Sequence, residues 1–460
     1  MPRTRLTLIL LTSAGVSLAL MQTLVIPALP FFGREFGASP SWTAWIVTGF
    51  LLSSSVLTPI VGRLGDAHGK KRILVVSLTV FGLASLGAAF AWNLPSLVAF
   101  RFAQGIGAAV FPLAFAIIRD EFPPERVGFA VGTVSSAFGI GGGVGLVLGG
   151  LMLEHLSWHW LFVAGGVPSL VVAALIARCV PESPVRTRAR ADWAGAGVLS
   201  LALIALLLAL SEGADWGWTS APVAGLAAAS VALLALWIRV ERRVQDPLID
   251  LRTLARRGMA ATNATTFLVG FAMTGFFVAV PALVQSPSAG FGASPVQAGL
   301  LLLPFSVAMM IGGPAGGALL GRAGRLAVLR GGLAAAALAV ALMAVSHGDE
   351  VLLCAWLALL GSGAAFALAA IGALVIDHSR PSETGVAGGM NSIMRTVGGA
   401  FGGQIAATLL TASAAGGLPA ERGFTQALAV TAAAAALGLA PTLLLRRAAA
   451  PAGVVAPARA

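Results

Sequence analysis

The stretch VGRLGDAHGKKRIL, residues 61–74, places four basic side chains, one acid and three glycines between two long apolar runs. A carboxylate in such a stretch can pair with a lysine or accept hydrogen bonds from the unpaired N–H groups of a helix N-terminus. Glycines are needed where a backbone turns sharply or where another backbone approaches closely. We therefore expect a short connection between two helices that makes polar contacts, with these residues at its centre: Gly62, Asp66, Gly69, Lys70 and Lys71.

Other chemistries that these residue types could support do not fit the spacing. The run GDAHGKK has the wrong glycine spacing for a phosphate-binding loop, and Lys71 stands where such a loop needs Ser or Thr. His155 and His159 lie four residues apart beside Glu154, but the order HExxH is absent, so we predict no metal site. No G-x-S-x-G nucleophile elbow occurs either. The sequence thus predicts neither an enzyme nor a bound cofactor.

The composition indicates which elements must carry these residues. Hydrophobic residues make up 58% of the 460 residues and charged residues only 10%, far from the balance of soluble proteins. Apolar stretches of about 20 residues, the length that spans a bilayer, recur with short polar interruptions. The basic N-terminus precedes an apolar run that is too long for a signal peptide, so we expect it to remain as the first helix. The fold class that follows is an all-α integral membrane protein.

We expect fourteen membrane helices, at residues 6–31, 42–62, 72–91, 96–118, 128–152, 158–180, 193–211, 220–239, 259–284, 295–320, 325–346, 350–377, 384–414 and 423–446. With the N-terminus inside, roughly 25 of the 29 basic residues fall on cytoplasmic segments, whereas Arg34 and Arg422 fall outside. The net charge of +11 therefore reports membrane topology and not a nucleic-acid partner. We predict a monomer in a bacterial plasma membrane, with both termini in the cytoplasm.

An internal repeat organises the fourteen helices. GRLGDAHGKKR, which begins at Gly62, is matched by GALLGRAGRLAVLR from Gly317, although Gly321 stands in the place of Asp66. PERVGFAVG from Pro124 aligns with PSETGVAGG from Pro381, at nearly the same offset. The simplest arrangement is a six-helix bundle at 1–190, two inserted helices with a cytoplasmic linker at 191–257, and a second six-helix bundle at 258–460. Parallel repeats of this kind are typical of carriers that rock two halves about a site at the membrane midplane.

Several motifs resemble those of the major facilitator superfamily, and specifically its fourteen-helix drug:proton antiporter branch. GRLGDAHGKK looks like the family signature between helices 2 and 3, and RFAQGIGAA at Arg101 looks like the helix 4 signature. GGGVGLVLGGLM resembles the antiporter signature of helix 5. FGASPVQAGLLLLP from Phe291 and ERRVQDPLIDL from Glu241 resemble segments of the fourteen-helix branch. The resemblance implies that Asp66, Lys70 and Asp120 form a cytoplasmic charge latch, made when the inside is closed.

The glycines of the fifth predicted helix have spacings that let a neighbouring backbone approach closely. Those of interest for helix packing are Gly141, Gly145, Gly149 and Gly150. The resemblance implies that the two halves meet here. The signature normally has Pro after the glycine at 145, where this chain has Leu146, so the kink that a proline would impose is an open question.

The positions of the acidic residues set this sequence apart from the antiporters that it resembles. Exporters of cationic drugs usually need a carboxylate inside the membrane, yet Met21 stands where the branch commonly has its helix 1 acid. All 18 acids fall in loops or at predicted helix ends, while Arg101 and Arg395 lie within helices, Arg101 at a depth where it can bond carbonyls or Gln22. If protons are coupled to transport, the residues available are Asp120 and the coupling candidates Arg101, Glu154 and Asp377.

We therefore expect a central cavity that is apolar and mildly electropositive and that favours neutral or anionic amphiphiles. By analogy with the family, its lining residues would be Met21, Gln22, Phe111, Phe115, Asn263, Phe271, Phe366, Asn391, Arg395 and Gln404. The leading functional hypothesis is a secondary active exporter, a proton-coupled antiporter, of small amphipathic molecules such as drugs or antibiotics. An uncoupled or inward-directed facilitator of a metabolite is the alternative, and a membrane scaffold without transport is a third class.

Overall fold

The computed structural model describes residues 2–38, 40–183, 192–244, 251–380, 383–413 and 420–445, and every regular element in these ranges is helical. Twelve helices are long and apolar enough to cross a membrane, and the bent pair of α7 and α8 passes together as a thirteenth. The remaining predicted span, 384–414, coincides with the long helix α18, which is not among the twelve because its glycines and polar residues make it less apolar. The all-helical membrane fold is confirmed, and the count of fourteen spans stays a prediction.

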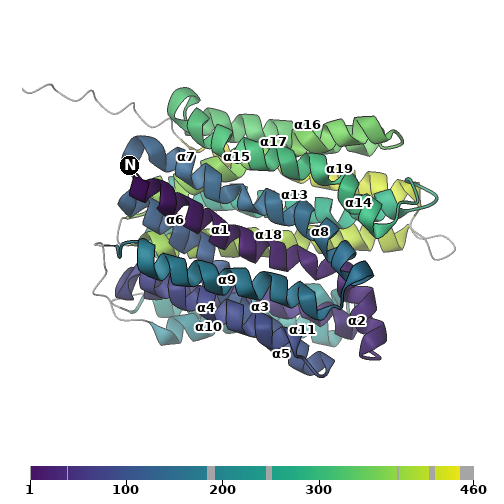
Figure 1. The fold of residues 1–460 in the computed structure, drawn as a ribbon, viewed down its shortest axis with the longest axis horizontal. Helices are drawn as coiled ribbons and strands as arrows, with labels where there is room; N and C mark the ends of the chain where they lie inside the picture. Colours follow the sequence, from purple (N-terminus) through teal and green to yellow (C-terminus); the bar gives the residue numbers. More distant parts are fainter. Residues whose placement is uncertain are drawn as a thin grey trace, which may run out of the picture.

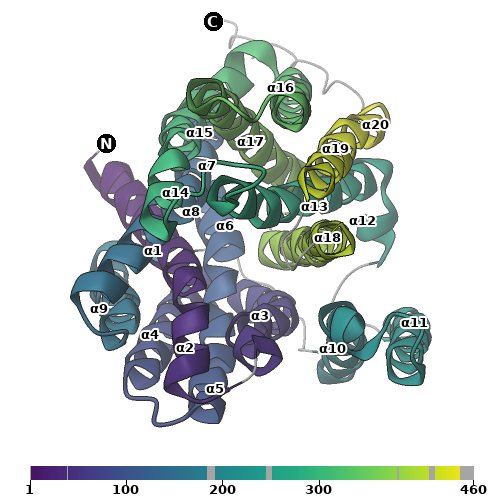
Figure 2. The same cartoon turned by 90° about the vertical axis from the view of Figure 1, so that its right-hand side faces the viewer.

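The N-terminal helices lie together and share one core (Figures 1 and 2). Their bounds are α1 (Pro2–Leu24), η1 (Ile26–Ala28), α2 (Leu29–Glu35), α3 (Pro40–His68), α4 (Lys70–Ala89), α5 (Leu94–Gln104), η2 (Gly105–Ala109), α6 (Val110–Glu121), α7 (Pro124–Ser135), α8 (Ala137–His155) and α9 (His159–Cys179). Buried apolar residues between Leu10 and Val180 form a contiguous cluster. Below, these helices are called the N half.

The C-terminal helices form a second body with its own core. Their bounds are α13 (Arg257–Gln285), α14 (Pro295–Leu301), α15 (Leu303–Ala323), α16 (Arg325–Val345), α17 (Glu350–His378), α18 (Thr384–Ala412), α19 (Glu421–Leu437) and α20 (Leu439–Thr442). Its buried apolar cluster runs from Ala261 to Leu445. These helices are called the C half.

The chain between the halves forms α10 (Trp193–Trp216), α11 (Ala221–Glu241) and the short α12 (Leu251–Ala255). Figure 2 places α10 and α11 at one side of the molecule, with α10 next to α3 and α18 and α11 on the outer side of α10. A third apolar cluster joins α10 and α11 to α18 through Leu199, Trp237 and Met390, and Thr48 of α3 contacts Ser211 of α10 at 3.3 Å between hydroxyl oxygens. The two helices thus lie against both halves on one side. The domain boundaries at 190 and 257 stay a prediction; 184–191 lies outside the described residues.

Several predicted spans are continuous in the sequence pattern but broken in the structure. Residues 6–31 are divided among α1, η1 and α2 near Pro27, which has no N–H to donate. Residues 96–118 are interrupted by η2, and 295–320 by a break at Leu302, just before Pro304. Hydropathy detects a membrane crossing but not such a local break, because both pieces of the span are equally apolar.

The connection after α3 is shorter than the sequence suggested. Helix α3 extends to His68, so most of the charged stretch is helical. Only Gly69 separates it from α4, with a φ of 110° that favours glycine. Lys71 and Arg72 lie in the first turn of α4, and their backbone N–H groups donate to Glu182 at 3.0 and 3.1 Å. The carboxylate at the N-terminus of α4 is therefore that of Glu182, while Asp66 accepts hydrogen bonds from the first turn of α18.

Candidate functional site

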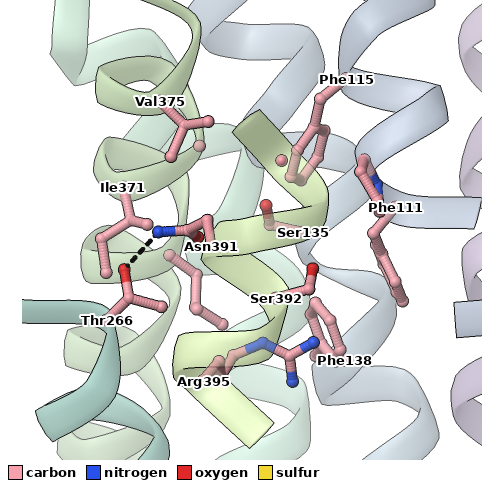
Figure 3. A pocket seen from close by; sticks show the side chains of 14 residues that line it. Phe111, Phe115, Ser135, Phe138, Thr266, Ile371, Val375, Asn391, Ser392 and Arg395 are labelled. Carbon is pink, nitrogen blue, oxygen red and sulfur yellow. Dashed lines mark hydrogen bonds between the residues drawn. The ribbon is translucent and has the colours of Figure 1, made fainter. Parts of the chain in front are cut away.

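A cavity lies between the two halves (Figure 3). From the N half, α6 and the α7–α8 segment provide three phenylalanines, a proline and a serine, and from the C half α13, α17 and α18 provide the remaining lining. The lining residues are Phe111, Pro112, Phe115, Ser135, Phe138, Thr266, Leu368, Ile371, Gly372, Val375, Gly388, Asn391, Ser392 and Arg395. None of these fourteen is acidic. Arg395 is the charged residue among them, so the cavity is apolar with a positive charge.

Arg395 projects from α18 across the cavity toward the N half (Figure 3). Its guanidinium carbon lies 4.7 Å from the centre of the Phe138 ring, in cation–π geometry. Phe138 is in turn stacked on Phe111, with ring centres 4.0 Å apart and ring planes at 14°. A guanidinium and two aromatic rings, drawn from three helices of both halves, thus form one layer of the cavity wall.

Asn391 lies one turn before Arg395 on α18. Its side-chain amide donates to the Asn263 side chain at 2.9 Å and to the Thr266 hydroxyl at 2.8 Å, and both partners are on α13. These bonds hold the α18 face that bears Asn391 and Arg395 in a fixed orientation relative to α13.

The structure brings four of the ten predicted cavity residues to this wall: Phe111, Phe115, Asn391 and Arg395. Asn263 does not line the cavity itself, but it accepts a hydrogen bond from Asn391, which does. Met21 is instead fully buried in the N half beside Gly165, and Phe366 packs against Gly316 and Gly332 inside the C half. Gln22, Phe271 and Gln404 also do not line this cavity. Phe138 is a lining residue that the sequence reasoning missed, because a phenylalanine in an apolar helix carries no signal that separates packing from a cavity wall.

The predicted cytoplasmic end of the cavity is closed by contacts between α3 and α18. Asp66 is fully buried; its carboxylate accepts hydrogen bonds from the backbone N–H groups of Gly385 and Val386, at 3.2 and 3.0 Å. These amides belong to the first turn of α18, where N–H groups have no partner within the helix. A carboxylate there also interacts favourably with the helix dipole. Gly62 of α3 packs directly against the Gly385 backbone, leaving no space for a side chain.

Lys70 and Asp120 form an ion pair inside the N half. The Nζ–Oδ2 distance is 2.6 Å, and the two side chains are 0% and 3% exposed. Ser183 also donates to Asp120. The resemblance implied one latch made of Asp66, Lys70 and Asp120; in the structure Lys70 pairs with Asp120 within the N half, and Asp66 bonds to the C half. The ion pair positions the α3–α4 connection, and Asp66 makes the bond that must break if the halves separate at this end.

A second contact between halves at this end comes from Arg119, next to Asp120 on α6. Its guanidinium donates to the carbonyl and hydroxyl of Ser379, at 3.0 and 2.9 Å, and to the hydroxyl of Thr384 at 2.8 Å. Arg119 therefore contacts Ser379, just after α17, and the start of α18, while Asp66 contacts the first turn of α18. Sequence reasoning missed Arg119 because its partners lie about 260 residues away and are small polar residues without a distinctive pattern.

The coupling candidates lie apart from the cavity. Arg101 is buried in the N half, where it donates to the Ile46 carbonyl at 2.8 Å and to Gln104 at 2.7 Å, and lies over the Phe50 ring. Its side-chain partner is Gln104, where the sequence suggested Gln22. Asp377 pairs with Arg325 at 2.7 Å, with both side chains partly exposed. Glu154 is exposed near the end of α8. In the part of the chain that the structure describes, no group of three or more His, Cys, Asp or Glu residues is placed to hold a metal ion.

The glycines of the fifth predicted helix divide between two faces. Gly141 and Gly145 pack against Ala19 and Thr23 of α1, and Thr23 donates to the Gly141 carbonyl. Gly150, on the other face, packs against Val296 of α14 in the C half. Gly149 is buried. The segments Pro124–Gly142 and Val147–His155 meet at 41° although the proline of the signature is absent, in keeping with the kinks that glycine-rich stretches permit.

Two bundles of membrane helices that enclose an apolar cavity and close it at one end define a multi-pass membrane carrier. The chain belongs to the Major Facilitator Superfamily, because the model of that family matches residues 11–260 and 262–460. This confirms the superfamily resemblance. The members of this family are transporters and not enzymes, as the sequence predicted.

Individual relatives agree with this assignment. The chain is 31% identical over 388 residues to an uncharacterized MFS-type transporter of Mycobacterium tuberculosis, covering 83% of this chain and 56% of the relative. It is 29% identical over 413 residues to the tetracenomycin C resistance and export protein of Streptomyces glaucescens, covering 87% of this chain and 75% of the relative. The chain therefore spans little more than half the length of the mycobacterial relative.

The fold is similar to a solved structure. The crystal structure of the human organic anion transporter MFSD10 (TETRAN) superposes with a TM-score of 0.67 and 17% sequence identity, covering 97% of this chain and 100% of the other. At this identity the likeness bears on the fold alone.

Proposed function

We propose that this transporter exports small neutral or anionic amphiphiles, such as antibiotics or drugs, by alternating access to the cavity between its halves. The observation that carries the proposal is the cavity wall itself, which combines Phe111, Phe115 and Phe138 with Arg395 and contains no carboxylate. An apolar wall with a few polar groups is typical of ligand sites, and a cationic wall disfavours a cationic ligand by charge repulsion. The similarity to a resistance and export protein supports the outward direction.

The closed contacts support the alternating part of the proposal. Asp66 and Arg119 bind the α17–α18 region across the interface between halves, and each bond is polar and reversible. Separation of the halves at this end would open the cavity to the predicted cytoplasm. Closure of this end and opening of the other would then release the substrate on the opposite side of the membrane.

The test is transport by the purified chain in proteoliposomes, with three dyes of matched size that carry a negative, no or a positive charge. We expect the anionic and neutral dyes to be moved and the cationic dye to be moved least. Replacement of Arg395 by Ala should reduce movement of the anion most. Preferential movement of the cation, unchanged by Arg395→Ala, would contradict the proposal.

Proton coupling is a further part of the proposal, with Asp120 and Asp377 as the candidates at the predicted cytoplasmic end and Glu154 at the other. A facilitator without proton coupling is the second candidate function. It is favoured by the absence of a carboxylate from the cavity wall and by Met21 at the place of the helix 1 acid. A pH-sensitive dye inside the proteoliposomes separates the two, because an antiporter moves protons when substrate is added and a facilitator does not.

A further inference from the structure

Arg395 is unusual because it lies well inside the long helix α18 and has no anionic partner among the residues that the structure describes. It is the twelfth residue of α18, about 17 Å along the helix from its start. Among the residues that the structure describes, no ion pair or hydrogen bond of its side chain is recorded, and its close contact is the Phe138 ring. A guanidinium has five N–H donors, and such a charge within a membrane protein normally has a partner and a function.

The cation–π contact with Phe138 stabilises the Arg395 guanidinium less than an anionic partner would. The aromatic face attracts the cation, but it accepts no directed hydrogen bond from the five donors. A carboxylate or sulfonate would bind the guanidinium through two parallel hydrogen bonds, which is the strongest neutral-pH interaction open to arginine. Because Arg395 lines the cavity, which in this closed form has a free volume of about 30 Å³, such a group would reach it there when the halves separate.

The neighbouring rings offer a flat apolar surface beside this charge. Phe138 has Arg395 over its ring and is stacked on Phe111, and Phe115 lies at 6.5 Å from Phe111 between ring centres. If an anionic group draws the guanidinium away from Phe138, the ring loses its cation and can take an aromatic ring of a ligand instead. The hydroxyl of Ser392, which lies about one turn before Arg395 on α18 and also lines the cavity, adds a polar group to the same wall.

We propose that the cavity binds a planar aromatic anion, with its anionic group on Arg395 and its ring system against the face of Phe138 that Arg395 now covers, so that the ligand extends the Phe138–Phe111 stack. This inference rests on the proposed function and names the substrate class more narrowly. It also gives the ligand a mechanical effect. Arg395 belongs to the C half and Phe138 to the N half, so the ligand replaces a direct contact between the halves by a contact through itself.

The first experiment measures equilibrium binding to the full chain in nanodiscs, with radiolabelled 1-naphthalenesulfonate as the probe. Two matched compounds separate charge from ring: 1-naphthalenemethanol keeps the ring without the charge, and cyclohexanesulfonate keeps the charge without an aromatic ring. Of the three compounds, we expect 1-naphthalenesulfonate to bind best. Arg395→Gln should weaken it by about tenfold or more, with partial recovery in Arg395→Lys, and Phe138→Leu should weaken it while leaving cyclohexanesulfonate unchanged.

Two control variants account for effects that do not pass through the cavity. Arg330→Gln removes a guanidinium that binds Thr442 at 3.0 and 2.8 Å, and Phe401→Leu removes a ring of the Phe267–Phe401 pair; neither residue lines the cavity. Both should bind naphthalenesulfonate like the unaltered chain. Equal binding of the sulfonate and the alcohol, or binding that is unaffected by Arg395→Gln, would overturn the inference.

Transport of the same compounds separates this inference from the proposed function. If neutral dyes are transported but naphthalenesulfonate does not bind, the inference is overturned and the proposed function stands. If naphthalenesulfonate binds through Arg395 but no amphiphile is transported, the site is supported and the proposed function is wrong.

Discussion

The two halves meet along two equivalent seams at the predicted cytoplasmic end, and the seams share their packing but not their polar contacts. In the Asp66 seam, between α3 and α18, Gly62 packs against the Gly385 backbone. In the Gly321 seam, between α15 and α7, Gly317 packs against the Gly128 backbone. These pairs are related by the sequence repeat, which carries Gly62 to Gly317 and Gly128 to Gly385. The Asp66 seam adds a buried carboxylate, and the other seam has Gly321 with open space around it.

The reason for the difference lies in where the partner helices begin. Helix α18 begins at Thr384, so the amides of Gly385 and Val386 are in its first turn and lack partners within the helix. Helix α7 begins at Pro124, one turn earlier in the repeat, so the amides of Gly128 and Phe129 lie past its first turn. A carboxylate at 321 would find no free amide there. The repeat thus keeps close packing in both copies, whereas the helix-capping contact is present only where a helix starts.

A second pair of equivalent contacts differs in burial. The repeat relates the Lys70–Asp120 pair of the N half to the Arg325–Asp377 pair of the C half. The first is buried, and the second is 39% and 31% exposed. Removing one partner of a buried pair leaves a charge without compensation, while an exposed pair is screened by water.

The largest expected effect comes from breaking these ion pairs. Lys70→Ala should lower the free energy of unfolding by about 3–5 kcal/mol, because the Asp120 carboxylate stays buried without the Lys70 ammonium group that pairs with it. Arg325→Ala, the matched variant, should cost about 0–1 kcal/mol. Unfolding of both variants in mixed detergent, followed by circular dichroism, measures the difference. Equal losses would show that the two pairs are not distinguished by burial.

The Asp66 contact should control closure more than stability. Asp66→Ala removes the acceptor of two amide hydrogen bonds, and charge-assisted bonds contribute about 1.5–3 kcal/mol each. Two such bonds contribute about 3 kcal/mol or more, and each 1.4 kcal/mol is a factor of ten, so we expect the open form at this end to gain about a hundredfold or more. The rate at which a membrane-impermeant maleimide labels Ser392→Cys from the predicted cytoplasmic side reports this change.

The labelling background for that experiment is the chain with Cys179 and Cys354 replaced by Ala. A rate that stays the same in Asp66→Ala would mean that Asp66 does not hold the seam closed. Asp66→Asn should give an intermediate rate, because its carbonyl oxygen can accept one of the two bonds.

The glycine pairs should respond alike in the two seams. A methyl group at Gly62 would meet the Gly385 carbonyl, and one at Gly317 would meet the Gly128 carbonyl. Gly62→Ala and Gly317→Ala should therefore each cost about 1–3 kcal/mol of closure through overpacking. The same labelling assay measures both, and a response in one seam alone would show that their packing is not equivalent.

The smallest expected effect is that of transferring the acid. Gly321→Asp adds a carboxylate in open space, where it meets no amide from the first turn of a helix. The free energy of closure should therefore change by less than about 0.5 kcal/mol, as for substitutions at other surface sites. Slower labelling of Ser392→Cys in this variant, by tenfold, would show that α7 offers free amides after all.

Much of the fold could be predicted because a bilayer leaves a strong signal. The predicted spans 193–211, 259–284 and 325–346 fall within a few residues of α10, α13 and α16, since only long apolar runs satisfy the membrane. The repeat of the glycine-rich connections predicted that the two halves are related, whereas the correspondence of the Lys70–Asp120 and Arg325–Asp377 pairs emerged from the structure. Breaks such as η2 escaped prediction because they depend on local backbone packing.

The site was predicted less completely. Asp66 and Arg395 could be singled out because charge is rare in this chain and each isolated charge needs a partner. Their partners could not be named: Gly385 and Val386 contribute only backbone amides, and Phe138 is one of 23 phenylalanines. Placement of Met21 and Phe366 in the cavity relied on family analogy, and both pack inside a half instead.

The most direct test of two halves that move about the cavity is electron paramagnetic distance measurement between spin labels on exposed positions at the predicted cytoplasmic end. The pairs are His68 with Arg380 across the Asp66 seam, Arg126 with Arg322 across the Gly321 seam, and His68 with Arg126 within the N half. The account predicts that Asp66→Ala lengthens both distances across the seams and leaves the distance within the N half unchanged. Fixed distances across both seams, or an equal change within the N half, would contradict it.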